Sequence, residues 1–339
     1  MRRNSGLRAV ALGFGVAASP LAAQAKCELH RLAEFQVKMV AGQPLIDGQV
    51  NGRSVTMMID TGAQSTAILQ SAARRLGLRP VQLANAHFYG VGGKSSIDYV
   101  TVDDIKVGAR DFGRNTVFVA GEDGPAAPSD ADVIVGMDVL SLADIEFDLA
   151  HGAIRLIKTK DCGEGDVVYW GGAYAMEKLQ KTGKGGEYKV TVDVNGRHID
   201  ALLDSGAAMS VLSLDGAHLA GLTVPASAKR EGAAIVGIGE KRVTQSVVKL
   251  DSFAFDQEKI MNTPVTVADL FSANREVATG DRLARNVMDF PEMLLGADFF
   301  WSHRIFLAKS EGKAYVSYVG GPVFATDTSP GPPAGASGN

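Results

Sequence analysis

The sequence predicts a mostly β protein that consists of two copies of one unit. Residues 50–63 (VNGRSVTMMIDTGA) align without gaps on residues 194–207 (VNGRHIDALLDSGA), and seven of the fourteen positions are identical. Farther along, residues 134–138 (IVGMD) match residues 294–298 (LLGAD). Short apolar runs separated by Gly-rich turns are typical of short strands. An internal repeat of this kind therefore indicates two similar β lobes in tandem.

Each copy predicts the same elements in the same order. An Asn-Gly turn joins two strands, and the second strand ends at an aspartate. A short strand and a short helix follow, and a glycine ends the helix. A hairpin with glycines at its tip comes next, then further short strands and an apolar pair before Gly-x-Asp. The turns are at 51–52 and 195–196, the helices lie within 69–78 and 213–222, and the final glycines are Gly77 and Gly221.

Composition shifts along the chain predict its domain boundaries. Segments rich in Pro, Gly and Ser are typical of disorder at a terminus. The segment between the two copies reads as a linker with one short helix over residues 173–182. The expected parts are a signal peptide (1–25), a first lobe (27–160), a linker (161–184), a second lobe (185–320) and a disordered tail (321–339).

The N-terminal segment predicts export from the cytoplasm. Three arginines precede or open an apolar stretch, and Ala23-Gln24-Ala25 has the pattern of a signal-peptide cleavage site. An uncleaved membrane anchor is the alternative, although the apolar run is shorter than the roughly 20 residues that a span needs. A lipid anchor on Cys27 is disfavoured by Lys26 directly before it. Removing residues 1–25 takes the formal net charge from −4 to −7.

Charge and cysteine content limit the classes of partner. There is no basic stripe, so nucleic acid is not an expected partner. The sequence has no CxxC, HExxH or clustered histidines, so we expect no metal site and no cofactor. The chain has two cysteines, Cys27 and Cys162. In an exported protein such a pair favours a disulfide, and two unrelated thiols are the alternative.

The paired Asp-hydroxyl-Gly segments carry the functional signal. One such triplet is weak evidence, because Asp and Gly are common turn residues. Here the triplet occurs twice at equivalent points of a repeat, as Asp60-Thr61-Gly62 and Asp204-Ser205-Gly206, each time after an apolar strand. The sequence resembles the aspartic peptidases in these triplets and in the apolar-apolar-Gly segments at 134–136 and 294–296. The small lobes and the alanine after each triplet are most similar to retropepsin-like domains.

The resemblance implies two acid-protease β-barrel lobes, related by a pseudo-two-fold axis and carrying a few short helices. Asp60 and Asp204 would then face each other, and two carboxylates so close share one proton. The resemblance also implies that Thr61 and Ser205 hydrogen-bond across the lobes. The glycines allow the backbone turn that brings the carboxylates together. Because the residues after them, Ala63 and Ala207, offer no hydroxyl to a carboxylate, we expect a pH optimum nearer neutral than that of gastric relatives.

The Gly-rich stretch at 87–96 resembles the flap hairpin of pepsin-like enzymes. It is not a phosphate loop, because Phe88 stands where that motif needs glycine. The resemblance implies that a mobile hairpin closes over a bound peptide. Val236 replaces the tyrosine in the second copy, which predicts one working flap; a merely packed hairpin aromatic is the alternative. The predicted flap and substrate-binding residues are Tyr89, Gly90, Gly92, Gly237 and Gly239.

These observations together predict an exported, monomeric aspartic endopeptidase that acts on peptide or protein substrates. A tandem retropepsin-like arrangement suggests the bacterial periplasm, and no membrane span is expected in the mature chain. A secreted peptide-binding protein of the same fold without catalysis is the alternative. A pairing of two chains is also conceivable, but the internal duplication makes it unnecessary. An insertion at 271–293, absent from the first copy, would either overhang the site or form a surface loop.

Overall fold

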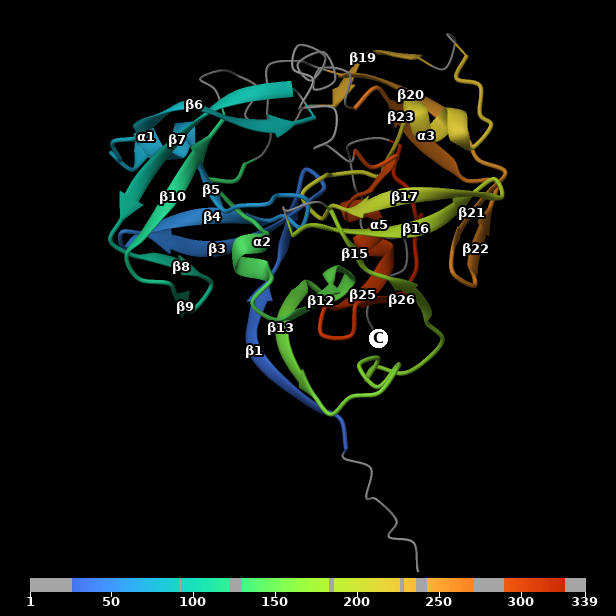
Figure 1. Ribbon diagram of the computed structural model, residues 1–339, viewed down its shortest axis with the longest axis horizontal. Helices are drawn as coiled ribbons and strands as arrows, with labels where there is room; N and C mark the ends of the chain where they lie inside the picture. The colour runs from blue at the N-terminus through green and yellow to red at the C-terminus, as the bar shows by residue number, and fades with distance from the viewer. Residues whose placement is uncertain are drawn as a thin grey trace, which may run out of the picture.

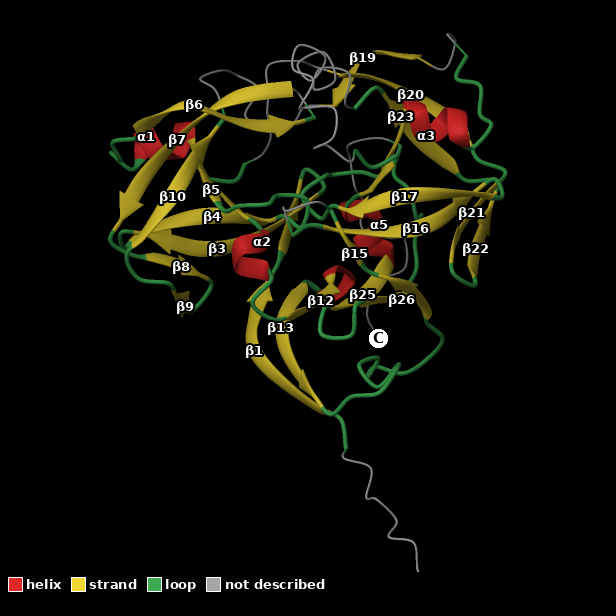
Figure 2. Ribbon diagram, viewed as in Figure 1, coloured by secondary structure: helices red, strands yellow, loops and turns green. Residues whose placement is uncertain are grey.

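The computed structural model describes residues 26–91, 93–121, 130–182, 186–225, 229–235, 243–270 and 290–326. In these ranges the chain is mostly β with a few short helices, as predicted (Figures 1 and 2). Two β lobes lie side by side in Figure 1, and a further sheet lies below them. The predicted signal peptide and residues 271–289 of the predicted insertion lie outside the described residues.

The first lobe is built on one curled sheet. Its strands are β2 (Lys38–Val40), β3 (Gln43–Val50), β4 (Arg53–Ile59), β5 (Ala67–Leu69), β6 (Val81–Gly90), β7 (Gly93–Val102), β8 (Ile105–Val107), β9 (Arg110–Asp111), β10 (Asn115–Ala120) and β11 (Val133–Val135). They are arranged in the order β6-β7-β10-β5-β11-β4-β3-β8-β9, and β2 pairs with β3. The short helices of this lobe are α1 (Gln70–Arg75) and α2 (Met137–Leu140).

The second lobe repeats this arrangement strand for strand. Its elements are β15 (Gln180–Lys181), β16 (Tyr188–Val194), β17 (Arg197–Leu203), β18 (Val211–Ser213), α3 (Leu214–Leu219), β19 (Lys229–Ile235), β20 (Val243–Lys249), β21 (Ser252–Phe255), β22 (Glu258–Met261), β23 (Pro264–Ala268), β24 (Met293–Leu295) and α5 (Ala297–Ser302). The order is β19-β20-β23-β18-β24-β17-β16-β21-β22, with β15 paired to β16. Each position has its counterpart in the first lobe, so the repeat in the sequence is a repeat of the fold.

A six-stranded sheet joins the two lobes. Its members are β1 (Glu28–Gln36), β12 (Asp144–Asp148), β13 (Ala153–Lys160), β14 (Ala175–Lys178), β25 (His303–Ala308) and β26 (Lys313–Tyr318), and the 3-10 turn η1 (Leu149–His151) connects β12 to β13. The order is β1-β13-β12-β25-β26-β14, with three strands from each lobe. At the centre β12 pairs antiparallel with β25. One buried apolar cluster continues through both lobes, and Phe147 meets Phe300 edge to face in it at 4.8 Å.

The Asn-Gly turns form as the sequence predicts. Asn51 and Gly52 have φ values of 48° and 70°, and Asn195 and Gly196 have values of 53° and 77°. Two consecutive positive φ values define the hairpin turn whose twist matches that of its strands. The Asn51 Oδ1 accepts a hydrogen bond of 2.7 Å from the Asp103 N–H, and the Asn195 side chain does the same for a backbone N–H of its own lobe. Each asparagine therefore fixes the loop beside its hairpin.

The disulfide between Cys27 and Cys162 closes one end of the shared sheet. Cys27 directly precedes β1, and Cys162 follows β13 by one residue. These two strands are antiparallel partners, and Glu28 lies opposite Lys160 at their open end. The disulfide thus ties the start of the described chain to the last strand of the first lobe.

The segment between the copies differs from the prediction. The helix expected over 173–182 is wrong, because this segment forms β14 on the edge of the shared sheet and then β15. The fold also extends beyond residue 320. Val323 and Phe324 are buried, and the ring of Phe324 lies 4.9 Å from that of Phe253. None of the helices in the described ranges has the length and apolar character needed to cross a bilayer.

Candidate active site

Each aspartate of the repeated triplets stands at the end of a buried strand. Asp60 follows β4, and its backbone N–H donates to the Val135 carbonyl at 3.1 Å. Asp204 follows β17, and its N–H donates to the Leu295 carbonyl at 2.9 Å. β4 pairs in parallel with β11, and β17 pairs in parallel with β24. These short parallel pairs carry both aspartates to the boundary between the lobes, where β4 and β17 approach each other in Figure 1.

The two carboxyl groups face each other across that boundary. A Cβ added to Gly62 would lie 2.5 Å from the Cγ of Asp204, and a Cβ on Gly206 would lie 2.3 Å from the Cγ of Asp60. Each glycine is therefore in direct contact with the carboxyl group of the opposite lobe. Both aspartates are half-buried. The structure thus brings together the two predicted acids and the two predicted glycines.

The hydroxyl residues of the triplets link the lobes. The Thr61 Oγ1 donates to the Leu203 carbonyl at 2.6 Å and accepts from the Ser205 N–H at 3.0 Å. The Ser205 Oγ donates to the Ile59 carbonyl at 2.8 Å and accepts from the Thr61 N–H at 3.1 Å. Both side chains are buried. Four hydrogen bonds shielded from water hold the two loops in one relative position.

A second set of hydrogen bonds supports each aspartate loop, and the sequence analysis did not predict it. The Thr66 Oγ1 donates to Asp138 Oδ1 at 2.7 Å and accepts from the Gly136 N–H at 3.1 Å. In the second lobe, the Ser210 Oγ donates to Asp298 Oδ1 at 2.6 Å and accepts from the N–H of the equivalent glycine at 2.9 Å. The sequence does contain a signal for these hydroxyl residues, because the repeat offset of 144 aligns Thr66 with Ser210. Asp138 and Asp298 are the aspartates of the two Gly-x-Asp segments.

Gly136 and Gly296 allow this brace because they lie against the loops. A Cβ on Gly136 would lie 2.6 Å from the carbonyl carbon of Ser65, and a Cβ on Gly296 would lie 2.4 Å from that of Met209. A side chain at either position would displace backbone. The apolar-apolar-Gly segments thus support the aspartate loops from below.

Comparisons with known families agree with this geometry. Residues 46–142 match the model of the gag-polyprotein putative aspartyl protease, and residues 190–299 match an aspartyl protease model. The chain belongs to the aspartyl proteases, with two retropepsin-like domains in tandem. A sequence search finds no significant match among curated proteins.

Two solved structures illustrate the fold likeness of these aspartyl protease domains. A retropepsin-like aspartic protease from Rickettsia conorii is 18% identical, and the match covers 40% of this chain and 95% of that one with a TM-score of 0.27. Basic 7S globulin from soybean is 12% identical, and the match covers 86% of this chain and 95% of that one with a TM-score of 0.43. The family assignment rests on the two model matches.

The two protease domains place Asp60 and Asp204 in environments that shift their pKa values to different extents. Burial raises the pKa of Asp60 well above its usual range, and the charge of Asp204 raises it further. Burial also raises the pKa of Asp204, but N–H donors from Ala207 and Gly206 and a hydrogen bond from Asp60 oppose the rise. A hydrogen bond to the charged form favours that form. Two carboxylates this close share one proton, and the direction of these effects favours the negative charge on Asp204.

The buried acids of this aspartyl protease should reduce its stability at neutral pH. A raised folded-state pKa means that the folded protein binds more protons than the unfolded one, so stability falls as pH rises from about 4 through the folded pKa. We expect Asp60→Asn to raise the free energy of unfolding at pH 7 and to lose this advantage below about pH 4. Urea unfolding followed over this pH range measures the difference. An equal effect of the substitution at both pH values would contradict the raised pKa.

The predicted flap is a hairpin in the first protease domain. β6 and β7 pair antiparallel, Tyr89 lies opposite Lys94, and Gly90 lies opposite Gly93 at the tip. Val91 in the turn packs against an apolar cluster of the second domain that includes Met209. The hairpin thus reaches across to the other domain. Gly92, Gly237 and Gly239 lie outside the described residues.

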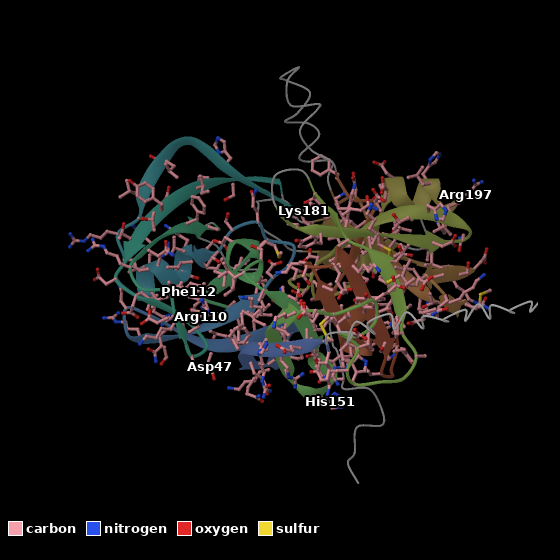
Figure 3. The ribbon with its side chains drawn as sticks, turned by 60° about the horizontal axis from the view of Figure 1, so that its bottom comes forward. Asp47, Arg110, Phe112, His151, Lys181 and Arg197 are labelled. Carbon is pink, nitrogen blue, oxygen red and sulfur yellow. A yellow bond between two sulfur atoms is a disulfide. The ribbon has the colours of Figure 1, made fainter. Side chains whose placement is uncertain are left out.

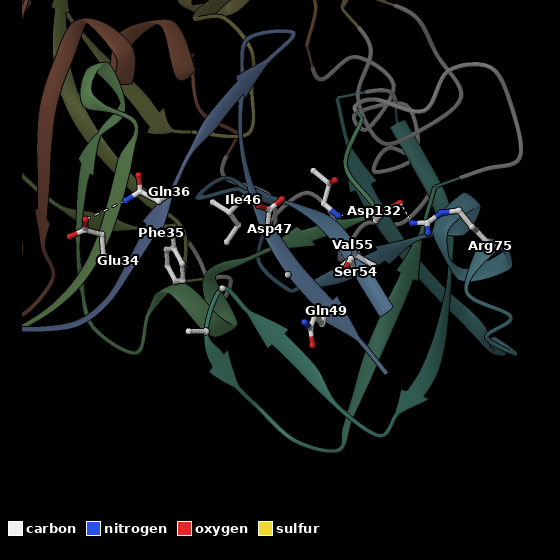
Figure 4. Close-up of a pocket in the computed structure, with 14 residues that line it drawn as sticks. Glu34, Phe35, Gln36, Ile46, Asp47, Gln49, Ser54, Val55, Arg75 and Asp132 are labelled. Atoms are coloured by element: carbon white, nitrogen blue, oxygen red, sulfur yellow. Dashed lines mark hydrogen bonds and ion pairs between the residues drawn. The ribbon is translucent and has the colours of Figure 1, made fainter. Parts of the chain in front are cut away.

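A pocket of about 860 Å³ lies elsewhere on the first protease domain (Figure 4). It is lined by parts of β1, β3 and β4 and contains the ion pair of Arg75 and Asp132 at 2.6 Å. Neither Asp-hydroxyl-Gly loop lines it, so it is separate from the candidate site. His151, labelled in Figure 3, has a side chain that is 69% exposed, and its Nδ1 lies 2.6 Å from an oxygen of the buried Asp148 carboxyl group.

Proposed function

We propose that this aspartyl protease is an exported endopeptidase in which Asp60 and Asp204 activate a water molecule for peptide hydrolysis. The observation that carries the proposal is the contact of each carboxyl group with the glycine of the opposite triplet. Such a contact supports a pair of acids that act as one unit. The cross-lobe hydrogen bonds of Thr61 and Ser205 support it, because rigid positioning is what acid–base catalysis needs.

The uneven pair suits the two proton transfers of the reaction. Asp204, the ionised member, would take a proton from the water as its oxygen attacks the scissile carbonyl carbon. Asp60, the protonated member, would give its proton to the carbonyl oxygen, so that a neutral tetrahedral species forms. Its collapse breaks the carbon–nitrogen bond as Asp204 gives its proton to the leaving amine and one hydroxyl of the tetrahedral species returns a proton to Asp60, so both acids regain their starting states. No covalent intermediate with the protein is needed.

The hairpin that reaches across the two lobes supports an extended peptide as the substrate class. An extended peptide would lie between the β6–β7 hairpin and the two aspartates, held by strand-like hydrogen bonds. The contact of Val91 with the second domain supports a hairpin that closes over the peptide. Because both acids come from one chain, a monomer suffices for activity.

Export to an oxidising compartment, such as the bacterial periplasm, is the second part of the proposal. The disulfide between Cys27 and Cys162 is compatible with it, because disulfides persist outside the reducing cytoplasm. The Arg-rich, apolar start of the sequence and Ala23-Gln24-Ala25 support a cleaved signal peptide. N-terminal sequencing of the protein recovered from a periplasmic fraction tests this part.

The experiment that tests hydrolysis is digestion of an unbiased peptide library by the purified mature chain. Asp60→Asn and Asp204→Asn are run beside it, since each keeps the shape of the site and removes one acid. We expect internal cleavage by the wild type and none by either variant. Cleavage that persists undiminished in the variants would overturn the mechanism. Binding of peptides without cleavage by the wild type would instead support the non-catalytic alternative.

A further inference from the structure

Gln43 reaches from the first lobe to the catalytic loop of the second. It is the first residue of β3, and its Nε2 donates to the Gly206 carbonyl at 2.7 Å. The side chain is 8% exposed, so water competes little for this hydrogen bond. Gly42 before it also touches that loop, because an added Cβ would lie 3.0 Å from the Cβ of Ala208. The turn between β2 and β3 is therefore seated on residues 206–208.

One peptide unit connects Gln43 to a candidate catalytic acid. The carbonyl of Gly206 and the N–H of Ala207 belong to the same peptide group. That N–H donates to Asp204 Oδ1 at 3.0 Å, and the same oxygen accepts the Gly206 N–H at 3.1 Å. A donor on the carbonyl side of a peptide polarises it and strengthens the hydrogen bond made by its N–H. Gln43 therefore acts on Asp204 through this peptide.

The first lobe has no equivalent of this arrangement among the described residues. The repeat offset places Glu187 where the first copy has Gln43. Glu187 accepts a hydrogen bond of 3.0 Å from the Thr182 Oγ1, and a carboxylate cannot donate to a carbonyl. The Ala207 N–H donates to Asp204 Oδ1 at 3.0 Å, whereas the Ala63 N–H lies 3.4 Å from the backbone carbonyl oxygen of Asp60. The two copies of the repeat therefore differ in the hydrogen bond that this position can make.

We propose that Gln43 is a positioning residue that holds the Gly206–Ala207 peptide so that Asp204, rather than Asp60, carries the negative charge of the pair. The inference rests on the proposed function, because it assigns different roles to the two acids of that site. In the described part of the chain, the ionisable group that faces each carboxyl is the other aspartate. The neutral amide of Gln43 is therefore a difference between the two positions that adds no charge of its own.

Two substitutions of nearly equal size test this role. Gln43→Met keeps the length of the side chain and removes the donor, so the anion on Asp204 loses stabilisation. We expect the acid limb of the kcat/KM profile to move up by about half to one pH unit. Gln43→Glu adds a negative charge beside the loop and should move the limb farther in the same direction. Gln36→Met is the matched control, because it makes the same substitution at an exposed amide that donates to Glu34 at 3.4 Å, and it should leave the profile unchanged.

A second measurement does not depend on turnover. Carbon-13 NMR of the aspartate carboxyl groups, assigned with Asp60→Asn and Asp204→Asn, follows both acids as pH changes. We expect Gln43→Met to raise the lower of the two titration midpoints and to narrow the difference between the acids. A lower melting temperature with an unmoved acid limb and unmoved midpoints would show a merely structural role and overturn the inference. Shifted midpoints in a chain that cleaves no peptide would uphold it while overturning the proposed hydrolysis.

Discussion

Gly206→Ala should lower kcat/KM by about 100-fold or more. The new Cβ would lie 2.3 Å from the Cγ of Asp60 and 2.5 Å from its Oδ2. Carbon atoms in contact are normally 3.5–4.0 Å apart, so the carboxyl group must move by more than roughly 1 Å. A misplacement of that size in a catalytic pair costs about two orders of magnitude in rate. Steady-state kinetics on one cleaved peptide, with circular dichroism to verify folding, measure the effect.

The matched control is Gly163→Ala. Gly163 has an ordinary φ, and the nearest atom to an added Cβ is the flexible Oδ2 of Asp166 at 3.3 Å. We expect wild-type kinetics from this variant.

Gly62→Ala should behave like Gly206→Ala, because its Cβ would lie 2.5 Å from the Cγ of Asp204. Wild-type activity in either loop variant would mean that the acids do not work in the opposed arrangement.

The core of the candidate site could be predicted because the repeat carries it. Asp60 and Asp204, the hydroxyl residues after them and the glycines occupy equivalent positions in two aligned segments. The repeated segments lie at the contact between the two lobes, so the aspartates at the ends of the equivalent strands meet there. The repeat likewise predicted that each element of the first lobe has a counterpart in the second, whereas the order of the strands within each sheet comes from the structure.

The residues that make the two acids unequal could not be found in this way. Gln43 and Glu187 occupy equivalent positions in the repeat but differ in chemistry. A search for residues that the two copies share therefore does not select them. Only the fold shows that the Gln43 side chain reaches the other lobe.

The hydrogen bonds beneath the aspartate loops were also not predicted. Asp138 and Asp298 were visible in the sequence as Gly-x-Asp, yet their hydroxyl partners are about 70 and 90 residues earlier in the chain.

The wrong helix over 173–182 has a physical cause. Ala, Met, Glu, Lys, Leu and Gln all favour helices, and they dominate this segment. In the fold, residues 175–178 complete the shared sheet by pairing with β26 and so occupy the place that β1 has in the first lobe. Burial and backbone pairing in a sheet outweigh a propensity of a few tenths of a kcal/mol per residue.

Glu146→Ala should destabilise the protein by about 3–5 kcal/mol. Glu146 lies in β12 at the centre of the shared sheet and is fully buried. Its carboxylate accepts hydrogen bonds from Arg155 at 2.9 Å, from Arg304 at 2.8 Å and from the Tyr169 hydroxyl at 2.6 Å. Arg155 comes from the first lobe and Arg304 from the second. Both arginine side chains are only 16% exposed. Without Glu146, Arg155 would keep Asp148 at 3.2 Å and Glu34 at 3.0 Å, but Arg304 would keep only the longer contact of 3.8 Å with Asp148 among the described carboxylates.

The size of the loss depends on burial rather than on the number of ion pairs. Glu28 provides the control, because it meets Lys160 at 3.7 Å on the edge of the same sheet but its side chain is 49% exposed. Glu28→Ala should leave the free energy of unfolding close to that of the wild type, since water screens an exposed pair. Urea unfolding at pH 7 compares the two variants. Equal losses would contradict the assignment. Removing the buried Glu146 leaves Arg304 with a described carboxylate no nearer than 3.8 Å, whereas removing the exposed Glu28 leaves a lysine that water solvates.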